Sequence, residues 1–176
     1  MKQIQLGKKV RVSDPCYGTK VWCAGTIDNV KEGLYNVEVE YSDEGDWGTR
    51  VKSILVFHSE FNWENFSIES TDFEVGVDSG QAGIYDEDYY NQYHTEDGCD
   101  DDWYDEVCKL TLSSEQFGTK DEKCIVSSSG FGDGGYTCLI LKQNEQVVGI
   151  AVVFITDEED EDCDVDFSEE EDEEDE

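Results

Sequence analysis

The sequence contains a single proline, Pro15, and no apolar run of about 18 residues, the length that crosses a bilayer. It therefore predicts neither a proline-rich linker between domains nor a membrane-spanning helix. Zinc ribbons and fingers use paired cysteines such as Cys-x-x-Cys, and no such pair is present. The Gly-x-Ser-x-Gly motif is also missing, and neither His58 nor His94 adjoins a recognised nucleophile motif. These absences argue against the common zinc folds and hydrolase folds.

Basic residues are scarce and unevenly placed. The chain has 12 Lys and Arg against 45 Asp and Glu, a formal net charge of −33. Residues 53–108 contain 16 acids and no base, and residues 157–176 also contain 16 acids and no base. Such a charge opposes direct binding to nucleic-acid phosphates or to an anionic membrane surface. It favours basic partners and cations instead.

The length of 176 residues suits one domain of ordinary size with an appendage. We expect a single β-rich domain over residues 1–156 and a self-repelling, disordered acidic tail over residues 157–176. The amino terminus lacks the apolar run of a secretory signal, and the seven cysteines are an odd number. Reduced thiols and a cytoplasmic location are therefore predicted.

Alternating β-branched and aromatic residues predict strands over most of the chain. Segments 10–12, 21–27, 34–41 and 49–57 are expected to form an antiparallel meander, and further strands are expected at 72–78, 81–85, 123–129, 135–142 and 146–155. Two short helices are expected, at 86–93 and 101–110, and the second has apolar residues at helical spacing and acids in its amino-terminal turn. The predicted fold class is mainly β, with antiparallel sheets in a sandwich-like arrangement.

Three loops carry residues that packing alone does not readily explain. The first, 13–18, holds Asp14 and Cys16 around an Asp-Pro turn. The second, 76–86, and the third, 127–136, are rich in glycine and hydroxyl groups. Their candidate residues are Asp78, Ser79, Gln81, Asp86, Ser128, Ser129, Asp133 and Tyr136. The alternative for each loop is a turn whose polar side chains bond its own backbone, and the third lacks the Lys and the helix of a phosphate-binding loop.

Convergence of the three loops would give the carboxylates a shared function. Asp14, Asp78, Asp86 and Asp133 would then bind Ca²⁺ or Mg²⁺, or supply an acid–base pair. If each carboxylate instead bonds its own surroundings, no shared site exists. No other cofactor is expected. Residues 96–102 concentrate oxygen ligands but break the calcium-loop pattern, so they favour a solvated helix start.

The motifs and their order resemble a bacterial and phage-associated family of domains of unknown function. The matching residues are Asp14, Pro15, Gly76, Val77, Asp78, Gly80, Asp86, Ser128, Ser129, Gly130, Gly132, Asp133, Gly134 and Tyr136. Phe131 and Gly135 stand where this family usually has Trp and Ser. The resemblance covers about residues 10–156 and implies one domain built around these loops, but it implies no activity.

Two hypotheses of function follow from these patterns. In the first, the chain is a noncatalytic acidic protein that binds a basic protein or a nucleic-acid-binding enzyme, as an inhibitor, an immunity-type protein or a DNA mimic would. The expected binding surface comprises Asp97, Asp100, Asp101, Asp102, Asp105 and Glu106. In the second, the three loops form a metal-dependent hydrolase or a cation-binding site. Neither hypothesis involves direct nucleic-acid or membrane contact, and both leave the oligomeric state open.

Overall fold

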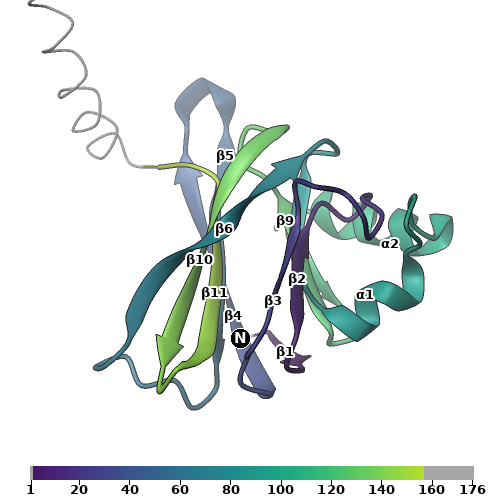
Figure 1. The fold of residues 1–176 in the computed structure, drawn as a ribbon. Coiled ribbons are helices and arrows are strands. Elements are labelled where there is room, and N and C mark those ends of the chain that lie inside the picture. The colour runs from purple at the N-terminus through teal and green to yellow at the C-terminus, as the bar shows by residue number, and fades with distance from the viewer. Residues whose placement is uncertain (1, 157–176) are drawn as a thin grey trace, which may run out of the picture.

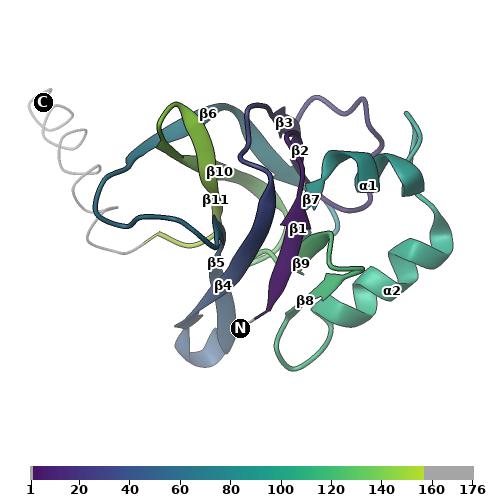
Figure 2. The same cartoon turned by 90° about the horizontal axis from the view of Figure 1, so that it is seen from below.

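The computed structural model describes residues 2–156, which form two antiparallel sheets and two helices (Figure 1). The two sheets face each other, and both helices lie on the outer face of the smaller sheet (Figures 1 and 2). The mainly β class with antiparallel sheets and two short helices is therefore confirmed. The predicted acidic tail lies outside the described residues. Neither helix within residues 2–156 is long and apolar enough to cross a membrane.

The larger sheet has six strands in the order β1-β4-β5-β11-β10-β6. Their bounds are β1 (Gln3–Leu6), β4 (Gly33–Asp43), β5 (Thr49–His58), β11 (Gln146–Val153), β10 (Gly134–Gln143) and β6 (Ser67–Val77). Side chains alternate between the two faces of these strands, so one apolar face points to the core. Val37, Ile54 and Ile150 on this face are buried. The tightest hairpin joins β10 to β11 through Asn144 and Glu145, both at positive φ, as a two-residue turn requires.

The smaller sheet has five strands in the order β3-β2-β7-β9-β8. Their bounds are β3 (Gly25–Ile27), β2 (Val10–Ser13), β7 (Gln81–Asp86), β9 (Cys124–Ser128) and β8 (Phe117–Lys120). All six residues of β7 are buried because this central strand is covered on both faces. Ile84 packs between the two sheets, whereas Tyr85 packs under the helices.

The helices cover the smaller sheet with a second, aromatic core. Helix α1 spans Glu87–Tyr93 and helix α2 spans Asp101–Thr111. Trp103 is 2% exposed, and its ring nitrogen donates a hydrogen bond to the Tyr89 hydroxyl at 2.9 Å. Each helix begins after an aspartate that accepts a backbone N–H of the first turn, Asp86 for α1 and Asp100 for α2. The same aspartates also complement the positive end of the helix dipole.

The predicted meander of the first four strands is wrong. Strands β2 and β3 belong to the smaller sheet, while β4 and β5 belong to the larger one. The chain crosses between the sheets after β3, where buried Val30 bonds through its N–H to Lys8 and forms a bridge with Val147. Local alternation cannot reveal such a crossing, because each strand has the same pattern in either sheet.

Several strand boundaries also differ from the prediction, and β6 begins at Ser67 rather than at residue 72. Residues 21–24 form turns rather than the start of a strand, and pairing begins only at Gly25. A Cβ at Gly25 would lie 2.3 Å from the Phe73 ring, so this position requires glycine for close approach. Strands β1 and β8 were not predicted, since each is only four residues long.

Removing the cap of α1 tests how this helix is attached. The Asp86 carboxylate accepts from the Tyr89 N–H at 3.1 Å and from the Gly7 N–H at 2.8 Å, and it joins α1 to the β1–β2 connection. We expect Asp86→Ala to lower the free energy of unfolding by about 1–3 kcal/mol in urea denaturation. Asp88→Ala removes the same charge from an exposed position of α1 and should change it by less than about 0.5 kcal/mol. Equal losses in the two variants would contradict the capping role.

Candidate functional site

The three loops meet at one end of the molecule and surround a hollow of about 850 Å³. Strand β6 is the edge strand of the larger sheet, paired with β10, and its carboxyl end reaches the smaller sheet near β2 (Figure 1). We call this cavity the three-loop hollow. Its lining residues are Tyr17, Lys20, Val21, Trp22, Cys23, Glu74, Gly76, Val77, Asp78, Asp133, Gly134 and Gly135. The volume lies within the range of ordinary ligand sites.

A buried carboxylate ties the first loop to the second. Asp14 has no exposed surface, and its oxygens accept the backbone N–H groups of Cys16, Asp78 and Ser79 at 2.7–2.8 Å. The Ser79 hydroxyl donates to the same carboxylate at 2.8 Å. Four donors satisfy the buried charge, as a buried ion requires. Asp14 therefore holds the turn between β6 and β7 in place and has no oxygen left to face the hollow.

A chain of uncharged groups continues this network beneath the loops. The Gln81 amide donates to the Ser79 hydroxyl at 3.2 Å, and its oxygen accepts from the Thr111 hydroxyl at 2.8 Å. The Ser128 hydroxyl lies 3.4 Å from the Thr111 carbonyl oxygen. Thr111 is the last residue of α2, so these contacts bind the loops to that helix. Ser79, Gln81 and Ser128 therefore support the loops from below.

Helix α1 fixes the first loop from the other side. The Tyr90 hydroxyl donates to the Tyr17 carbonyl oxygen at 2.7 Å. His94 stacks on the Tyr90 ring at 3.5 Å between centroids, and its Nε2 lies 2.9 Å from the Pro15 carbonyl oxygen. Both rings are buried. The Asp-Pro turn is thus held by the helix that covers the smaller sheet.

The third loop is closed by its own side chains. The Tyr136 hydroxyl donates to the Gly132 carbonyl oxygen at 2.6 Å and to that of Ser129 at 3.1 Å. Ser129 in turn donates through its N–H to the Gly80 carbonyl oxygen at 3.1 Å and through its hydroxyl to Gly132 at 2.9 Å. Gly132 and Gly134 have φ of 115° and 155°, which other residues rarely adopt. Ser129 and Tyr136 therefore shape the loop, and Asp133 between the two glycines stays exposed.

The carboxylates of Glu74, Asp78 and Asp133 line the hollow and are exposed. The β6–β10 ladder ends with Gly134 opposite Val77, so Asp133 and Asp78 are the next residues of the two chains. Asp78 accepts a hydrogen bond from the Tyr17 hydroxyl at 3.0 Å. Burial is the main cause that raises the pKa of Tyr17, and hydrogen bonds to Cys23 and Asp78 raise it further. The phenol therefore keeps its proton and remains a hydrogen-bond donor.

Among residues 2–156, Lys20 is the one base that lines the three-loop hollow. Lys20 forms an ion pair with Glu96 at 3.5 Å, and both side chains are 70% exposed. A pair this exposed contributes little to stability. The free carboxylates of the hollow therefore outnumber its bases, and the hollow suits a cationic group better than an anion.

Cys16 does not have the properties of a reactive cysteine. Burial, together with the neighbouring Asp14, raises the pKa of its thiol to about 12. Burial also raises the pKa of Cys99 to about 11, and Asp101 and Asp100 add to that shift. A nucleophilic cysteine needs the opposite shift, toward the thiolate. Both thiols are protonated near neutral pH, so they pack as small apolar groups.

The four predicted aspartates divide into two kinds. Asp78 and Asp133 line the three-loop hollow, whereas Asp14 is committed to the backbone beneath it. Asp86 is the last residue of β7, at the end of the strand away from the three-loop hollow, and it caps α1. Within residues 2–156, no three His, Cys, Asp or Glu side chains stand close enough to hold a metal ion. The four carboxylates therefore do not gather around one point.

The acidic residues at α2 form a separate surface. Asp97, Asp101, Asp102 and Asp105 are exposed. Asp100 caps α2 through the Trp103 N–H at 2.9 Å, and Glu106 pairs with Lys120. A small pocket of about 250 Å³ lies between these acids and the stacked rings of Tyr93 and Trp103. We call these four aspartates, together with Asp100 and Glu106, which are also exposed, the α2 acidic surface.

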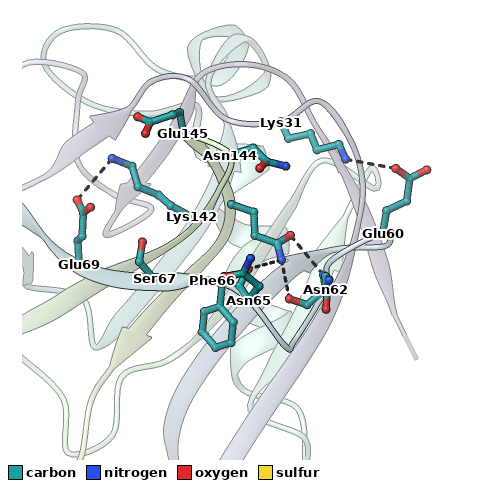
Figure 3. A pocket seen from close by; sticks show the side chains of 11 residues that line it. Lys31, Glu60, Asn62, Asn65, Phe66, Ser67, Glu69, Lys142, Asn144 and Glu145 are labelled. Carbon is teal, nitrogen blue, oxygen red and sulfur yellow. Dashed lines mark hydrogen bonds and ion pairs between the residues drawn. The ribbon is translucent and has the colours of Figure 1, made fainter.

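A further hollow, of about 550 Å³, was not predicted from the sequence. It lies at the opposite ends of β6 and β10, where Lys31 and Lys142 stand on its rim (Figure 3). Each lysine is directed to a glutamate, Glu60 at 3.3 Å and Glu69 at 3.5 Å. Both lysines of this hollow are therefore neutralised, and Glu145, which also lines it, leaves one carboxylate in excess. No sequence motif marks this hollow.

Sequence reasoning also missed Tyr17, Trp22 and Glu74 as residues of the three-loop hollow. Trp22 is 87% exposed, an unusual position for so large an apolar side chain. The sequence placed it in a predicted strand, where alternation would have given it a packing role. Pro15, Gly18 and Gly25 flank the segment that contains Trp22, and such residues indicate a long turn.

Replacing the buried carboxylate tests the loop assembly. In Asp14→Asn, the amide NH₂ would oppose one of the N–H donors that now point at a carboxylate oxygen. We expect the free energy of unfolding to fall by about 2–4 kcal/mol in urea denaturation. Asp133→Asn makes the same chemical change at an exposed position and should alter it by less than about 0.5 kcal/mol. An Asp14→Asn protein as stable as the Asp133→Asn protein would show that the carboxylate does not hold the loops.

Comparison with known proteins gives a family match that covers the loops described above. A family model described as "Protein of unknown function (DUF4241)" matches residues 8–153. No curated protein and no solved structure matches the chain. The matched range includes all three loops, both helices and every strand except β1. The chain therefore belongs to this family of proteins of unknown function, as the resemblance in its loop motifs predicted.

Proposed function

We propose that this chain is a noncatalytic acidic protein that binds a basic protein partner, such as a nucleic-acid-binding enzyme. The observation that carries the proposal is the exposure of unpaired acids on a firmly built surface. All six acids of the α2 acidic surface are exposed, and α2 itself packs through Trp103 and Val107 into the aromatic core. The charges are thus held at fixed positions, as complementary recognition requires.

A fixed negative surface acts first on the rate of encounter. The carboxylates repel one another, and two unit charges 4 Å apart near a surface cost about 4 kcal/mol. A basic partner relieves this repulsion, and its attraction extends over a Debye length of about 10 Å in ordinary salt. Steering of this kind raises association rates and is lost at high salt. The protein would therefore compete with anionic ligands of its partner, as an inhibitor or DNA mimic does.

The alternative function, a metal-dependent hydrolase or cation-binding protein, has less support from the geometry. It needs several carboxylates directed at one point, but Asp14 and Asp86 are engaged in backbone hydrogen bonds. The remaining pair, Asp78 and Asp133, lacks a third ligand among the described residues. Cys16 and Cys99 are protonated near neutral pH and offer no nucleophile. The cytoplasmic location of the protein remains a prediction from its sequence.

Neutralising the α2 acidic surface tests the proposal. The partner is first captured from lysate of the source cells at low salt, purified, and its association with the protein is measured by stopped-flow at several salt concentrations. A variant with four substitutions should associate about tenfold more slowly at low salt and approach the unmodified protein at high salt. These substitutions are Asp97→Asn, Asp101→Asn, Asp102→Asn and Asp105→Asn. They spare the helix cap Asp100 and the paired Glu106.

A matched control removes the same number of exposed acids elsewhere. Its substitutions are Glu38→Gln, Asp46→Asn, Glu64→Gln and Glu115→Gln. The control should slow association by a smaller factor, because net charge falls equally but the local surface is intact. Equal rates for both variants at every salt concentration would contradict a role for the α2 acidic surface. A protein that retains no basic partner at low salt would contradict the proposal itself.

Deleting residues 157–176 provides a second test of electrostatic steering. This segment lies outside the described residues, and it carries 16 of the 45 acids. Its removal should lower the association rate at low salt and flatten the dependence of that rate on salt, with little change in the dissociation rate. Thermal melting should be unchanged if the segment contributes charge alone. If the deletion variant keeps the full salt dependence of the association rate, residues 157–176 do not contribute to electrostatic steering.

A further inference from the structure

The most exposed large apolar side chain among residues 2–156 stands at the three-loop hollow. Trp22 is 87% exposed, although tryptophan gains more than most residues from being covered. The turn that bears it is well anchored, because the Gly76 N–H bonds the Cys23 carbonyl oxygen at 2.7 Å. An exposed tryptophan on a fixed turn is typical of a residue that a partner covers, and tryptophan is frequent among the residues that dominate binding energy.

The hollow also carries negative charge. Glu74, Asp78 and Asp133 line it, and Lys20, the one base that lines it among residues 2–156, is paired with Glu96. Aromatic and carboxylate groups around one cavity complement a cation that also has an apolar or planar surface. Charge complementarity therefore selects the occupant: a basic side chain rather than an apolar one or an anion.

Two glycines let the walls of the hollow pack closely. A Cβ at Gly135 would lie 2.8 Å from a carboxylate oxygen of Glu74, and one at Gly76 would lie 2.6 Å from the Cys23 sulfur. A larger residue at either position would displace these side chains. Glycine at both positions therefore holds Glu74 and the turn that bears Trp22 close to the backbone of β10 and β6.

The same end of the molecule already shows how a guanidinium binds there. Arg50 lies over the Phe131 ring at 5.3 Å from the centroid and donates to the Trp47 carbonyl oxygen at 2.9 Å. Phe131 belongs to the third loop and is 53% exposed. Stacking on an aromatic face suits the planar guanidinium better than the compact, strongly hydrated ammonium of lysine.

We propose that the three-loop hollow is an anchor pocket for an arginine side chain of the basic partner. The guanidinium stacks against Trp22 and pairs with Asp78 and Asp133, while the α2 acidic surface attracts the rest of the partner. This inference rests on the proposed function and adds the site and the side chain to it. Arginine is preferred over lysine because only its fork can pair with a carboxylate through two parallel bonds while it stacks.

The test compares two peptides of equal charge, octa-arginine and octa-lysine, by fluorescence anisotropy with the full chain. We expect the unmodified protein to bind octa-arginine about threefold to tenfold more tightly. Trp22→Ala should reduce this preference to less than about twofold. Trp22→Phe should keep part of it, because the aromatic face remains. The double variant Asp78→Asn, Asp133→Asn should weaken octa-arginine binding more than octa-lysine binding.

A matched control is available on the β4–β5 hairpin. Trp47 is 69% exposed and lies outside the hollow, so Trp47→Ala should keep the full preference for arginine. Unchanged thermal melting of both alanine variants shows that each still folds. Equal affinity of the unmodified protein for the two peptides, or an intact preference in Trp22→Ala, would overturn the arginine pocket but leave the proposed function standing. Failure of both peptides to bind at low salt would count against the proposed function as well.

Discussion

The arrangement of the loops depends on one buried carboxylate. Asp14 is fully buried, and three backbone N–H groups and one hydroxyl donate to it. Leaving such a charge without its donors would cost several kcal/mol, so the donors and the carboxylate fix one another. Because three of the four donors belong to the turn between β6 and β7, the end of the larger sheet is joined to the first loop of the smaller sheet. The three-loop hollow exists only in that arrangement.

The acids of this chain therefore have two different roles. Asp14, Asp86 and Asp100 accept backbone N–H groups and stabilise turns or helix starts. Others, such as Asp78 and Asp133, carry their charge on the surface with few partners. The acids that accept backbone N–H groups stabilise the fold, and the exposed acids give the surface of the protein a negative potential. Self-repulsion among the surface acids is tolerable because two packed cores, between the sheets and beneath the helices, hold the chain together.

Much of the fold could be predicted from local patterns. Alternation gave β4, β5, β10 and β11, both helices were expected near their observed bounds, and helical spacing with acids in the first turn indicated α2. The assignment of β2 and β3 to a different sheet could not be predicted, since it depends on the buried crossing at Val30. For the site, the motifs indicated the three loops, which do meet. Asp14 and Asp78 occupy similar turns in the sequence, so only burial distinguishes the structural carboxylate from the exposed one. Trp22 was misassigned because its neighbours favour a strand.

The central claim is that negative charge on fixed loops recognises a cationic side chain. The most direct measurement is a titration of the isotope-labelled full chain with an arginine-rich peptide, followed by backbone amide chemical shifts. The account predicts that the largest shifts fall at residues 17–23, 74–78 and 133–135, with smaller shifts at residues 97–106. Shifts spread evenly over the acidic residues, or concentrated at the hollow of Lys31 and Lys142, would contradict it.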